Sequence, residues 1–147
     1  MNDHNSSPVY LAIDFGEKFT GLAQFCAQRD PYPIPAGRIA GSQPISEIIQ
    51  IIKDEQINTV IIGLPLLLDG QETSMTKKVR VFADQLEQAC KKANLFLKFF
   101  LWDETLSTYE AKERMKNSPQ FNFKVDLKRV DEISALIILE EFLRRSQ

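Results

Sequence analysis

The sequence predicts a mixed α/β fold, in which a five-stranded sheet carries helices on both faces. Three strand-like segments open the chain, and strand-like and helix-like segments then alternate. This order favours a mixed sheet over an all-parallel one. With 147 residues, of which 44% are hydrophobic and 26% charged, the chain can bury a core of ordinary size. We expect one domain over residues 1–147, with residues 1–8 as a flexible polar leader.

The strands are predicted from short apolar runs bounded by turn residues. The first two runs are separated by a tight turn and predict a β-hairpin. Residues 59–62 form a continuous β-branched run, which is typical of a buried central strand. We expect Gly63 and Pro65 to end that strand. The predicted strands cover residues 9–15, 19–26, 36–40, 59–62 and 95–102.

The helices are predicted from apolar positions that repeat with the helical period. Isoleucine recurs at positions 45, 48, 49 and 52, which places these side chains on one helix face. Ser107 and Glu110 form a capping box at the start of a later helix, and Asp126 is a candidate N-cap for the last one. The predicted helices cover residues 44–55, 72–93, 107–116 and 127–145, with loops over 29–35 and 118–124.

Bulk properties disfavour several classes of protein. The formal net charge is −2, so the chain as a whole is not a general polyanion binder. Residues 1–8 lack the apolar segment of a secretory signal, and the longest apolar run, residues 60–68, is too short to span a bilayer. Cys26 and Cys90 stand in apolar settings, which favours free thiols in a reducing compartment. We expect a cytoplasmic protein with no membrane partner.

Asp14 ends the first predicted strand at the point where the chain turns back. Aspartate is depleted from strands and is rarely buried without a partner, so packing explains it poorly. Gly16 and Gly21 let the backbone turn and let another group approach closely. A carboxylate in such a place suits a hard cation beside a phosphate group. The simpler alternative is an ordinary turn residue.

Two further acidic positions are predicted to meet Asp14. Asp103 and Glu104 follow the last predicted strand, and parallel strands would bring them to the same sheet edge, where open α/β sheets bind ligands. Asp131 lies on the apolar face of the last helix, so we expect it to point toward the sheet and Glu132 to face solvent. The alternatives are a helix N-cap at Asp103, a surface acid at Glu104, and a helix-dipole contact at Asp131.

Three carboxylates at one point repel one another unless divalent cations lie between them. Two Mg²⁺ ions about 3.5–4 Å apart can activate a water and stabilise the leaving oxygen of a phosphodiester. Oxygen ligands suit Mg²⁺ or Mn²⁺. The only histidine, His4, lies in the polar leader, so zinc chemistry and a histidine general base are disfavoured.

A local basic stretch lies between residues 112 and 129. It holds six basic residues and two acidic ones, enough to contact phosphates on an otherwise acidic protein. A solvated surface loop is the alternative, which charge alone favours. The aromatic run that ends at Trp102 is interpreted as core rather than as a surface for stacking bases.

Four short motifs, taken in order, resemble the YqgF/RuvX family, which has a ribonuclease H-like fold. They extend over nearly the whole chain, and their order and spacing carry the resemblance more than any one of them does. The motifs are Asp14-Phe15-Gly16; Ile62-Gly63-Leu64-Pro65 with Asp69-Gly70; Asp103-Glu104 with Leu106-Ser107-Thr108 and Glu110-Ala111; and Val130-Asp131 with Ser134-Ala135 and Ile138-Leu139.

The resemblance implies nuclease action on structured nucleic acid. Family members are described as nucleases that trim the 5′ end of the small-subunit ribosomal RNA precursor (pre-16S rRNA), and as Holliday junction resolvases acting on branched DNA. The family's acidic residues correspond to Asp14, Glu104 and Asp131, which would be the catalytic residues and the ligands of Mg²⁺ or Mn²⁺. Thr105 stands where the family usually has arginine, so a phosphate or structural contact is lost.

We expect Lys18, Lys128 and Arg129 to position backbone phosphates without reading sequence. Lys128 matches the basic residue that commonly precedes the last aspartate in the family. The expected partners are structured RNA or branched DNA, including ribosomal precursor particles. A junction resolvase would need paired sites on a twofold axis, whereas an rRNA nuclease could act alone, so both monomer and homodimer stay open.

Two other hypotheses compete with the nuclease. The opening hairpin also resembles the phosphate-binding hairpin of sugar kinases and actin-like ATPases, but 147 residues leave no room for their second lobe. The chain could also be a non-catalytic RNA-binding or ribosome-assembly factor, because a fold can persist after activity is lost. Retention of all three acids argues against this hypothesis, and Thr105 argues for it.

Overall fold

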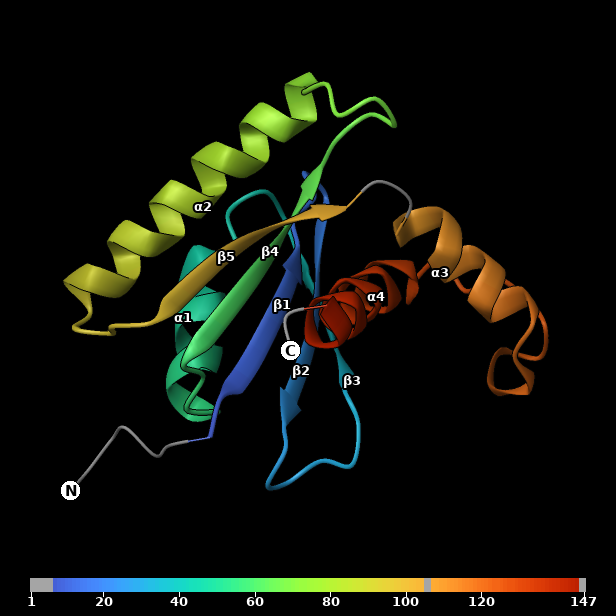
Figure 1. The fold of residues 1–147 in the computed structure, drawn as a ribbon, viewed down its shortest axis with the longest axis horizontal. Coiled ribbons are helices and arrows are strands. Elements are labelled where there is room, and N and C mark those ends of the chain that lie inside the picture. The colour runs from blue at the N-terminus through green and yellow to red at the C-terminus, as the bar shows by residue number, and fades with distance from the viewer. Residues whose placement is uncertain (1–6, 105–106, 146–147) are drawn as a thin grey trace.

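A five-stranded mixed sheet forms the centre of the molecule in a computed structural model that describes residues 7–104 and 107–145. The strand order is β3-β2-β1-β4-β5. β1 pairs antiparallel with β2 and parallel with β4, and β5 is parallel to β4. The carboxyl ends of β1, β4 and β5 therefore meet at one edge (Figure 1). The strands are β1 Val9–Asp14, β2 Phe19–Cys26, β3 Ile34–Ala40, β4 Thr59–Pro65 and β5 Lys98–Glu104.

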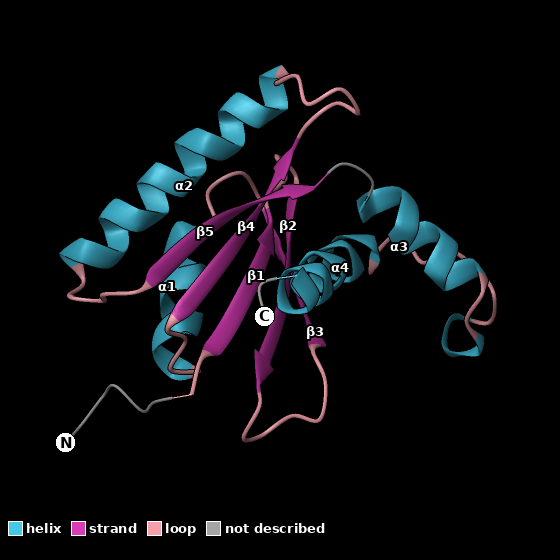
Figure 2. Ribbon diagram, viewed as in Figure 1, coloured by secondary structure: helices cyan, strands magenta, loops and turns pink. Residues whose placement is uncertain are grey.

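Helices cover both faces of the sheet, as Figure 2 shows. One apolar core lies between the sheet and the pair α1 and α2, and includes Leu11 and Ile13 of β1. A second core lies under α4 and includes Ala12 of the same strand. Alternate residues of a strand point to opposite faces, so β1 contributes to both cores. The helices are α1 Ile45–Asp54, α2 Ser74–Lys92, α3 Ser107–Lys116 and α4 Val130–Arg145, with a short 3₁₀ turn at Pro119–Phe121.

The mixed five-stranded sheet with helices on both faces is confirmed, and the order of elements is the predicted one. Cys26 and Cys90 are both free thiols. The capping box at Ser107 cannot be compared, because the side chains at 107 and 108 lie outside the described residues. No helix in the described part of the chain is long and apolar enough to cross a membrane.

Several predicted boundaries are wrong: β3 begins at Ile34 rather than at residue 36, and β5 covers Lys98–Glu104 rather than residues 95–102. Local hydrogen bonding explains two further differences. β4 continues through Gly63 to Pro65, because Pro65 still pairs with Glu104 of β5 and a proline at a strand end sacrifices only one donor. The last helix begins at Val130 rather than at residue 127. Asp126 accepts from the backbone N–H of Lys128 and closes a separate turn, so it does not cap the helix.

Candidate catalytic carboxylate site

The parallel pairing of β1, β4 and β5 brings two predicted acids to one edge of the sheet. Asp14 is the last residue of β1 and Glu104 the last of β5. Asp14 has the same strand parity as Ala12, and Glu104 the same as Trp102, and both of these residues belong to the core under α4. Asp14 and Glu104 therefore project from the face that α4 covers. Asp103 has the opposite parity and is exposed, which identifies Glu104 as the inward member of the pair.

Gly63 lies between these two acids and lets α4 approach the sheet. It lies on β4, between β1 and β5, and pairs with Trp102. A Cβ added at Gly63 would meet the side chain of Ile138 on α4 and would lie 3.6 Å from the Cβ of Glu104. Because glycine has no side chain, Ile138 occupies this position and α4 packs closely on β4. Gly63 was predicted to end its strand, although a glycine within a β-branched strand can mark such a close approach.

Gly21 brings the third acid to the same place. It is the residue opposite Asp14 in the β1–β2 ladder, and the first turn of α4 packs directly on it. A Cβ at Gly21 would overlap the carbonyl oxygen of Asp131 and would lie 2.8 Å from the backbone nitrogen of Glu132. The predicted close approach at Gly21 is confirmed, and the approaching group is the backbone of Asp131 itself.

The three acids interact electrostatically. Burial raises the pKa of Asp14 well above its usual value, and the negative charges of Glu104 and Asp131 raise it further. Burial also raises the pKa of Asp131, although the neighbouring Arg38 opposes that rise. A buried carboxylate that faces two others favours its neutral form unless a cation joins them. The three acids therefore favour the binding of a positively charged group.

Arg38 supplies one positive charge and was not predicted. It comes from β3, two strands away from Asp14 across the sheet. One of its guanidinium nitrogens lies 3.6 Å from an Asp131 oxygen. The guanidinium also lies over the ring of Phe19, 3.6 Å from the ring centroid. No sequence pattern links residues 38 and 131, because their contact depends on how α4 crosses the sheet.

Glu132 is not solvated, so that prediction is wrong. Its side chain is only 12% exposed. One carboxylate oxygen accepts a hydrogen bond from the backbone N–H of Gly37, at 2.7 Å, and the other accepts from Nε of Arg129. Helical spacing does turn Glu132 away from Asp131, but β3 lies in that direction. Glu132 thus joins the start of α4 to the strand that carries Arg38.

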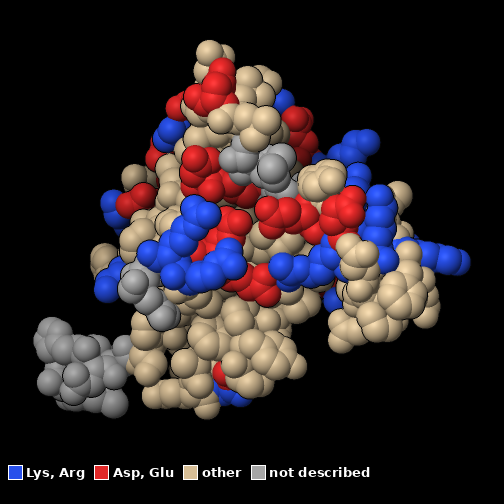
Figure 3. Space-filling model, turned by 45° about the vertical axis from the view of Figure 1, so that its right-hand side comes forward, with Lys and Arg blue, Asp and Glu red and all other residues tan. Residues whose placement is uncertain are grey.

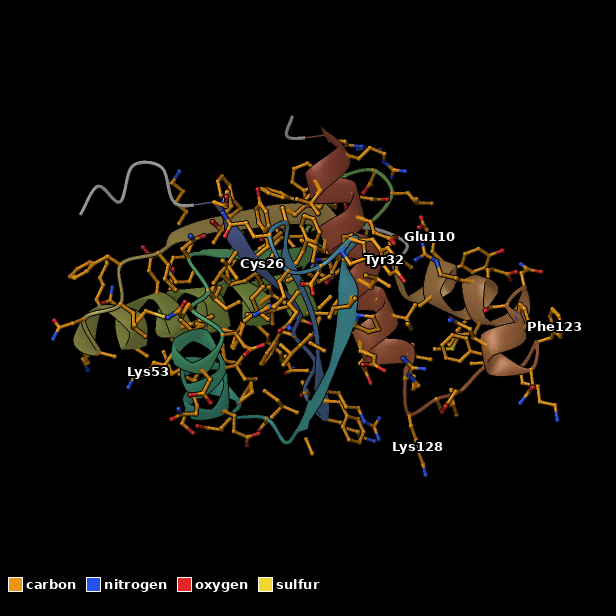
Figure 4. All side chains as sticks on the ribbon, turned by 90° about the horizontal axis from the view of Figure 1, so that it is seen from below. Cys26, Tyr32, Lys53, Glu110, Phe123 and Lys128 are labelled. Carbon is orange, nitrogen blue, oxygen red and sulfur yellow. The ribbon has the colours of Figure 1, made fainter. Side chains whose placement is uncertain are left out.

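The predicted phosphate-binding residues differ in their surroundings. Lys18 and Lys128 are exposed, and Figure 4 shows the Lys128 side chain projecting away from the sheet. Arg129 pairs with Glu132 and lies over the ring of Phe121, so it helps hold the structure together. In the basic stretch, Arg114 pairs with Glu140 of α4. Acidic and basic side chains are interleaved on the face shown in Figure 3, so this face presents no broad basic surface.

The donor set fits a hard cation, although the side chains are not yet gathered around one position. Within residues 7–104 and 107–145, no three metal-ligating side chains lie close enough together to hold an ion as they stand. The acids offer only oxygen donors, which suit Mg²⁺ or Mn²⁺, and a desolvated Asp14 facing two acids is the observation that favours such an ion. Thr105 lies outside the described residues.

Replacing Glu132 is expected to loosen the junction between α4 and β3. In Glu132→Ala, the N–H of Gly37 and the guanidinium of Arg129 both lose their partner, which costs about 1–3 kcal/mol when such groups are partly buried. Urea denaturation measures the loss. Glu141→Ala on the same helix is the matched control, and equal stability of the two variants would contradict the role of Glu132.

Together these features define a class of protein: a nucleic-acid-cleaving enzyme of the ribonuclease H-like fold, with acids from β1, β5 and α4 at the carboxyl edge of a mixed sheet. Residues 8–145 match the family described as "RuvX: Holliday junction resolvase". The chain belongs to this family.

Full-length relatives support the assignment. A protein of Maridesulfovibrio salexigens is 38% identical over 141 residues, which cover 92% of this chain and 98% of the relative. Proteins of Shewanella oneidensis and Escherichia coli are each 33% identical and cover 93% and 95% of this chain. All three carry the name "Putative pre-16S rRNA nuclease".

Solved structures confirm the fold. RuvC of Thermus thermophilus matches with a TM-score of 0.57 at 10% identity, over 94% of this chain and 96% of RuvC. RuvC bound to a Holliday junction substrate gives 0.55 at 9% identity, over 93% and 95% of the two chains. The yeast mitochondrial resolvase Ydc2 gives 0.51 at 14% identity, over 94% of this chain and 78% of Ydc2.

Proposed function

We propose that this protein is a metal-dependent nuclease that hydrolyses phosphodiester bonds in structured nucleic acid. Asp14, Glu104 and Asp131 are the proposed catalytic residues and the proposed ligands of Mg²⁺ or Mn²⁺. One observation carries the proposal: Asp14 and Glu104 end parallel-aligned strands at one sheet edge, where α4 seats Asp131 on Gly21, and burial and the two other acids raise the pKa of Asp14. Packing gains nothing from that arrangement, whereas cation binding depends on it.

In the proposed mechanism each acid has a distinct support. Asp14 is fixed by the β1–β2 ladder opposite Gly21, Glu104 by pairing with Pro65, and Asp131 by the seat of α4 on Gly21. These acids would hold a divalent cation, which would lower the pKa of a coordinated water and stabilise the departing oxygen. These supports fix the backbone that carries each acid before the substrate arrives, which lowers the cost of organising the site.

The exposed cations are proposed to hold the substrate strand. Lys18 lies in the hairpin turn after Asp14, and Lys128 lies just before α4, which carries Asp131. Both lysines therefore lie on segments adjacent in sequence to a proposed catalytic acid. We propose that both contact backbone phosphates, which orients a strand without reading its sequence. Arg129 pairs with Glu132, but 41% of its side chain is exposed. We propose that this exposed part also contacts a backbone phosphate.

The proposed substrate is the 5′ end of pre-16S rRNA, presented on a ribosomal precursor particle and processed during ribosome biogenesis. The names of the curated relatives favour it. The second candidate is a branched DNA junction, which the family description favours. Both substrates offer a bent or branched backbone, so shape would decide where the strand is cut. The RNA reaction needs one site, and the junction reaction needs a homodimer.

Cleavage of two labelled substrates tests the proposal. A 5′-extended pre-16S rRNA fragment and a four-way DNA junction are each incubated with wild-type protein and with Asp131→Asn, in Mn²⁺, in Mg²⁺ and in EDTA. We expect the wild type to cut the RNA with either metal, and both EDTA and Asp131→Asn to stop cleavage.

Each alternative has its own result. Cleavage of the junction alone would replace the rRNA assignment with the resolvase. Binding without cleavage of either substrate, together with no stabilisation by Mn²⁺ in thermal unfolding, would indicate a non-catalytic RNA-binding assembly factor. Cleavage that persists in EDTA would refute the metal-dependent mechanism.

A further inference from the structure

Arg38 is a cation held in place at the edge of the carboxylate site. Its guanidinium stacks on Phe19 at 3.6 Å from the ring centroid and lies 3.6 Å from Asp131. Its side chain is only 26% exposed. A guanidinium over an aromatic face is attracted to the ring and keeps its planar donor edge free. That donor edge is directed at Asp131.

The backbone that carries Arg38 is fixed as well. Its neighbour Gly37 has a φ of +86°, a value that favours glycine, and donates its N–H to Glu132 at 2.7 Å. Glu132 follows Asp131 in α4, so one helical turn holds both the carboxylate and the strand that supplies its cation. The pairing of Arg38 with Asp131 is therefore part of the folded framework.

The guanidinium and a divalent cation would compete for the same carboxylate. Both are attracted to Asp131, and the guanidinium 3.6 Å from one carboxylate oxygen offsets negative charge that would otherwise attract a metal ion. Two positive groups on one carboxylate also repel each other across a few ångströms of poorly screened space.

We propose that Arg38 is an exchangeable counter-ion: it neutralises Asp131 in the metal-free protein, and it moves to a phosphate of the bound nucleic acid when metal takes Asp131. Both halves of this proposal rest on the proposed function, in which Asp131 holds metal and the protein binds nucleic acid. Planar guanidinium groups bind carboxylates and phosphates with the same donor geometry, so the exchange replaces one partner with another. The Phe19 ring keeps the guanidinium at the edge of the site while its donor nitrogens change partner.

The exchange makes metal and substrate binding mutually dependent. A phosphate that attracts Arg38 frees Asp131 for metal, and metal that takes Asp131 frees Arg38 for phosphate. By linkage, each ligand must then strengthen the binding of the other by the same factor. The free protein is consequently a weak metal binder that tightens on its substrate.

Calorimetric titration of Mn²⁺ into the full chain, without nucleic acid, tests the first half. We expect Arg38→Gln to bind Mn²⁺ about tenfold more tightly than the wild type, because a competing positive charge about 4 Å from a ligand is lost. Arg38→Lys keeps the charge and should stay near the wild type. Arg29→Gln, which removes an arginine paired with Asp30 and Glu55, is the matched control and should not change the affinity.

Binding of a phosphorothioate oligonucleotide, which resists cleavage, tests the second half. In saturating Mn²⁺, Arg38→Gln should bind it about three- to tenfold more weakly than the wild type. In EDTA, where Arg38 is occupied by Asp131, the two proteins should bind it equally. Phe19→Leu removes the stack but keeps the arginine, and should lie between them in Mn²⁺, which provides a second variant if Arg38→Gln folds poorly.

The outcomes separate this inference from the proposed function. Unchanged or weaker Mn²⁺ binding by Arg38→Gln would overturn the exchange. An equal loss of oligonucleotide affinity in EDTA and in Mn²⁺ would also overturn it, because Arg38 would then be a fixed phosphate ligand. Failure of the proposed function would instead appear as absent cleavage by the wild type, with the order of Mn²⁺ affinities among the variants unaffected.

Discussion

Asp14→Asn is expected to abolish cleavage while leaving the fold intact. The substitution keeps the size of the side chain and removes the charge that a divalent cation needs. Loss of several kcal/mol of metal-dependent transition-state stabilisation corresponds to a fall in kcat of about 1,000-fold or more. Single-turnover cleavage of the preferred substrate measures it, and Asp103→Asn, on the opposite face of β5, is the control that should retain activity.

The same substitution should stabilise the protein when metal is absent. The pKa of Asp14 is raised in the fold, so in EDTA the wild type loses stability as the pH rises from the unfolded-state pKa through that raised value. Asparagine removes this loss. At neutral pH in EDTA, Asp14→Asn should therefore melt at a higher temperature, by about 2–4 °C for each kcal/mol gained.

Two results would contradict this account of Asp14. One is a melting temperature in EDTA that does not change or falls, because burial and the neighbouring acids would then not disfavour the charged form of Asp14 in the fold. The other is wild-type cleavage by Asp14→Asn, which would remove Asp14 from the catalytic set. Saturating Mn²⁺ should raise the melting temperature of the wild type more than that of the variant, since a ligand stabilises the state that binds it.

Gly21→Ala is expected to lower both stability and the cleavage rate, because it displaces the first turn of α4. The added Cβ would overlap the carbonyl oxygen of Asp131 and crowd the nitrogen of Glu132, and backbone atoms cannot swing aside as a flexible side chain can. The first turn of α4 must move, at a typical overpacking cost of about 1–3 kcal/mol. A displacement near 1 Å at a catalytic group can cost about 100-fold in rate. We expect both losses in denaturation and cleavage assays.

Gly41→Ala is the control that distinguishes displacement of α4 from a general loss of stability. Gly41 has a φ of +99° and no atom within 4 Å of an added Cβ, so its substitution strains the backbone without moving α4. It should lower stability and leave cleavage near the wild-type rate. Equal loss of cleavage in the two variants would show that Gly21 matters only for stability.

Much of the fold and the acid triad could be predicted from the sequence because the signals were local. The β-branched run at residues 59–62 and the helical spacing of the isoleucines each follow from the period of a single element. The inward direction of Asp131 also followed from one helix face. The meeting of Asp14 with Glu104 needed one more assumption, that their strands run in parallel, and the strand pairing confirms it.

The parts that the sequence did not predict depend on contacts between distant elements. Arg38 and Glu132 obtain their partners from the way α4 crosses β3, and no period within one element encodes that crossing. Glu132 was wrongly placed in solvent because helical geometry gives a direction but not what lies there. Gly63 was taken as a strand end, whereas it lies within β4 and leaves room for Ile138 of α4.

The alternation of side chains along β1 limits where the chain can change length. One extra residue within β1 would turn Asp14 to the opposite face of the sheet, away from Asp131. The connection between β2 and β3 lies at the other end of the sheet from the carboxylates (Figure 1), and its tip at residues 31–32 is exposed. A fluorophore or affinity tag inserted there would label the protein without altering the carboxylate site.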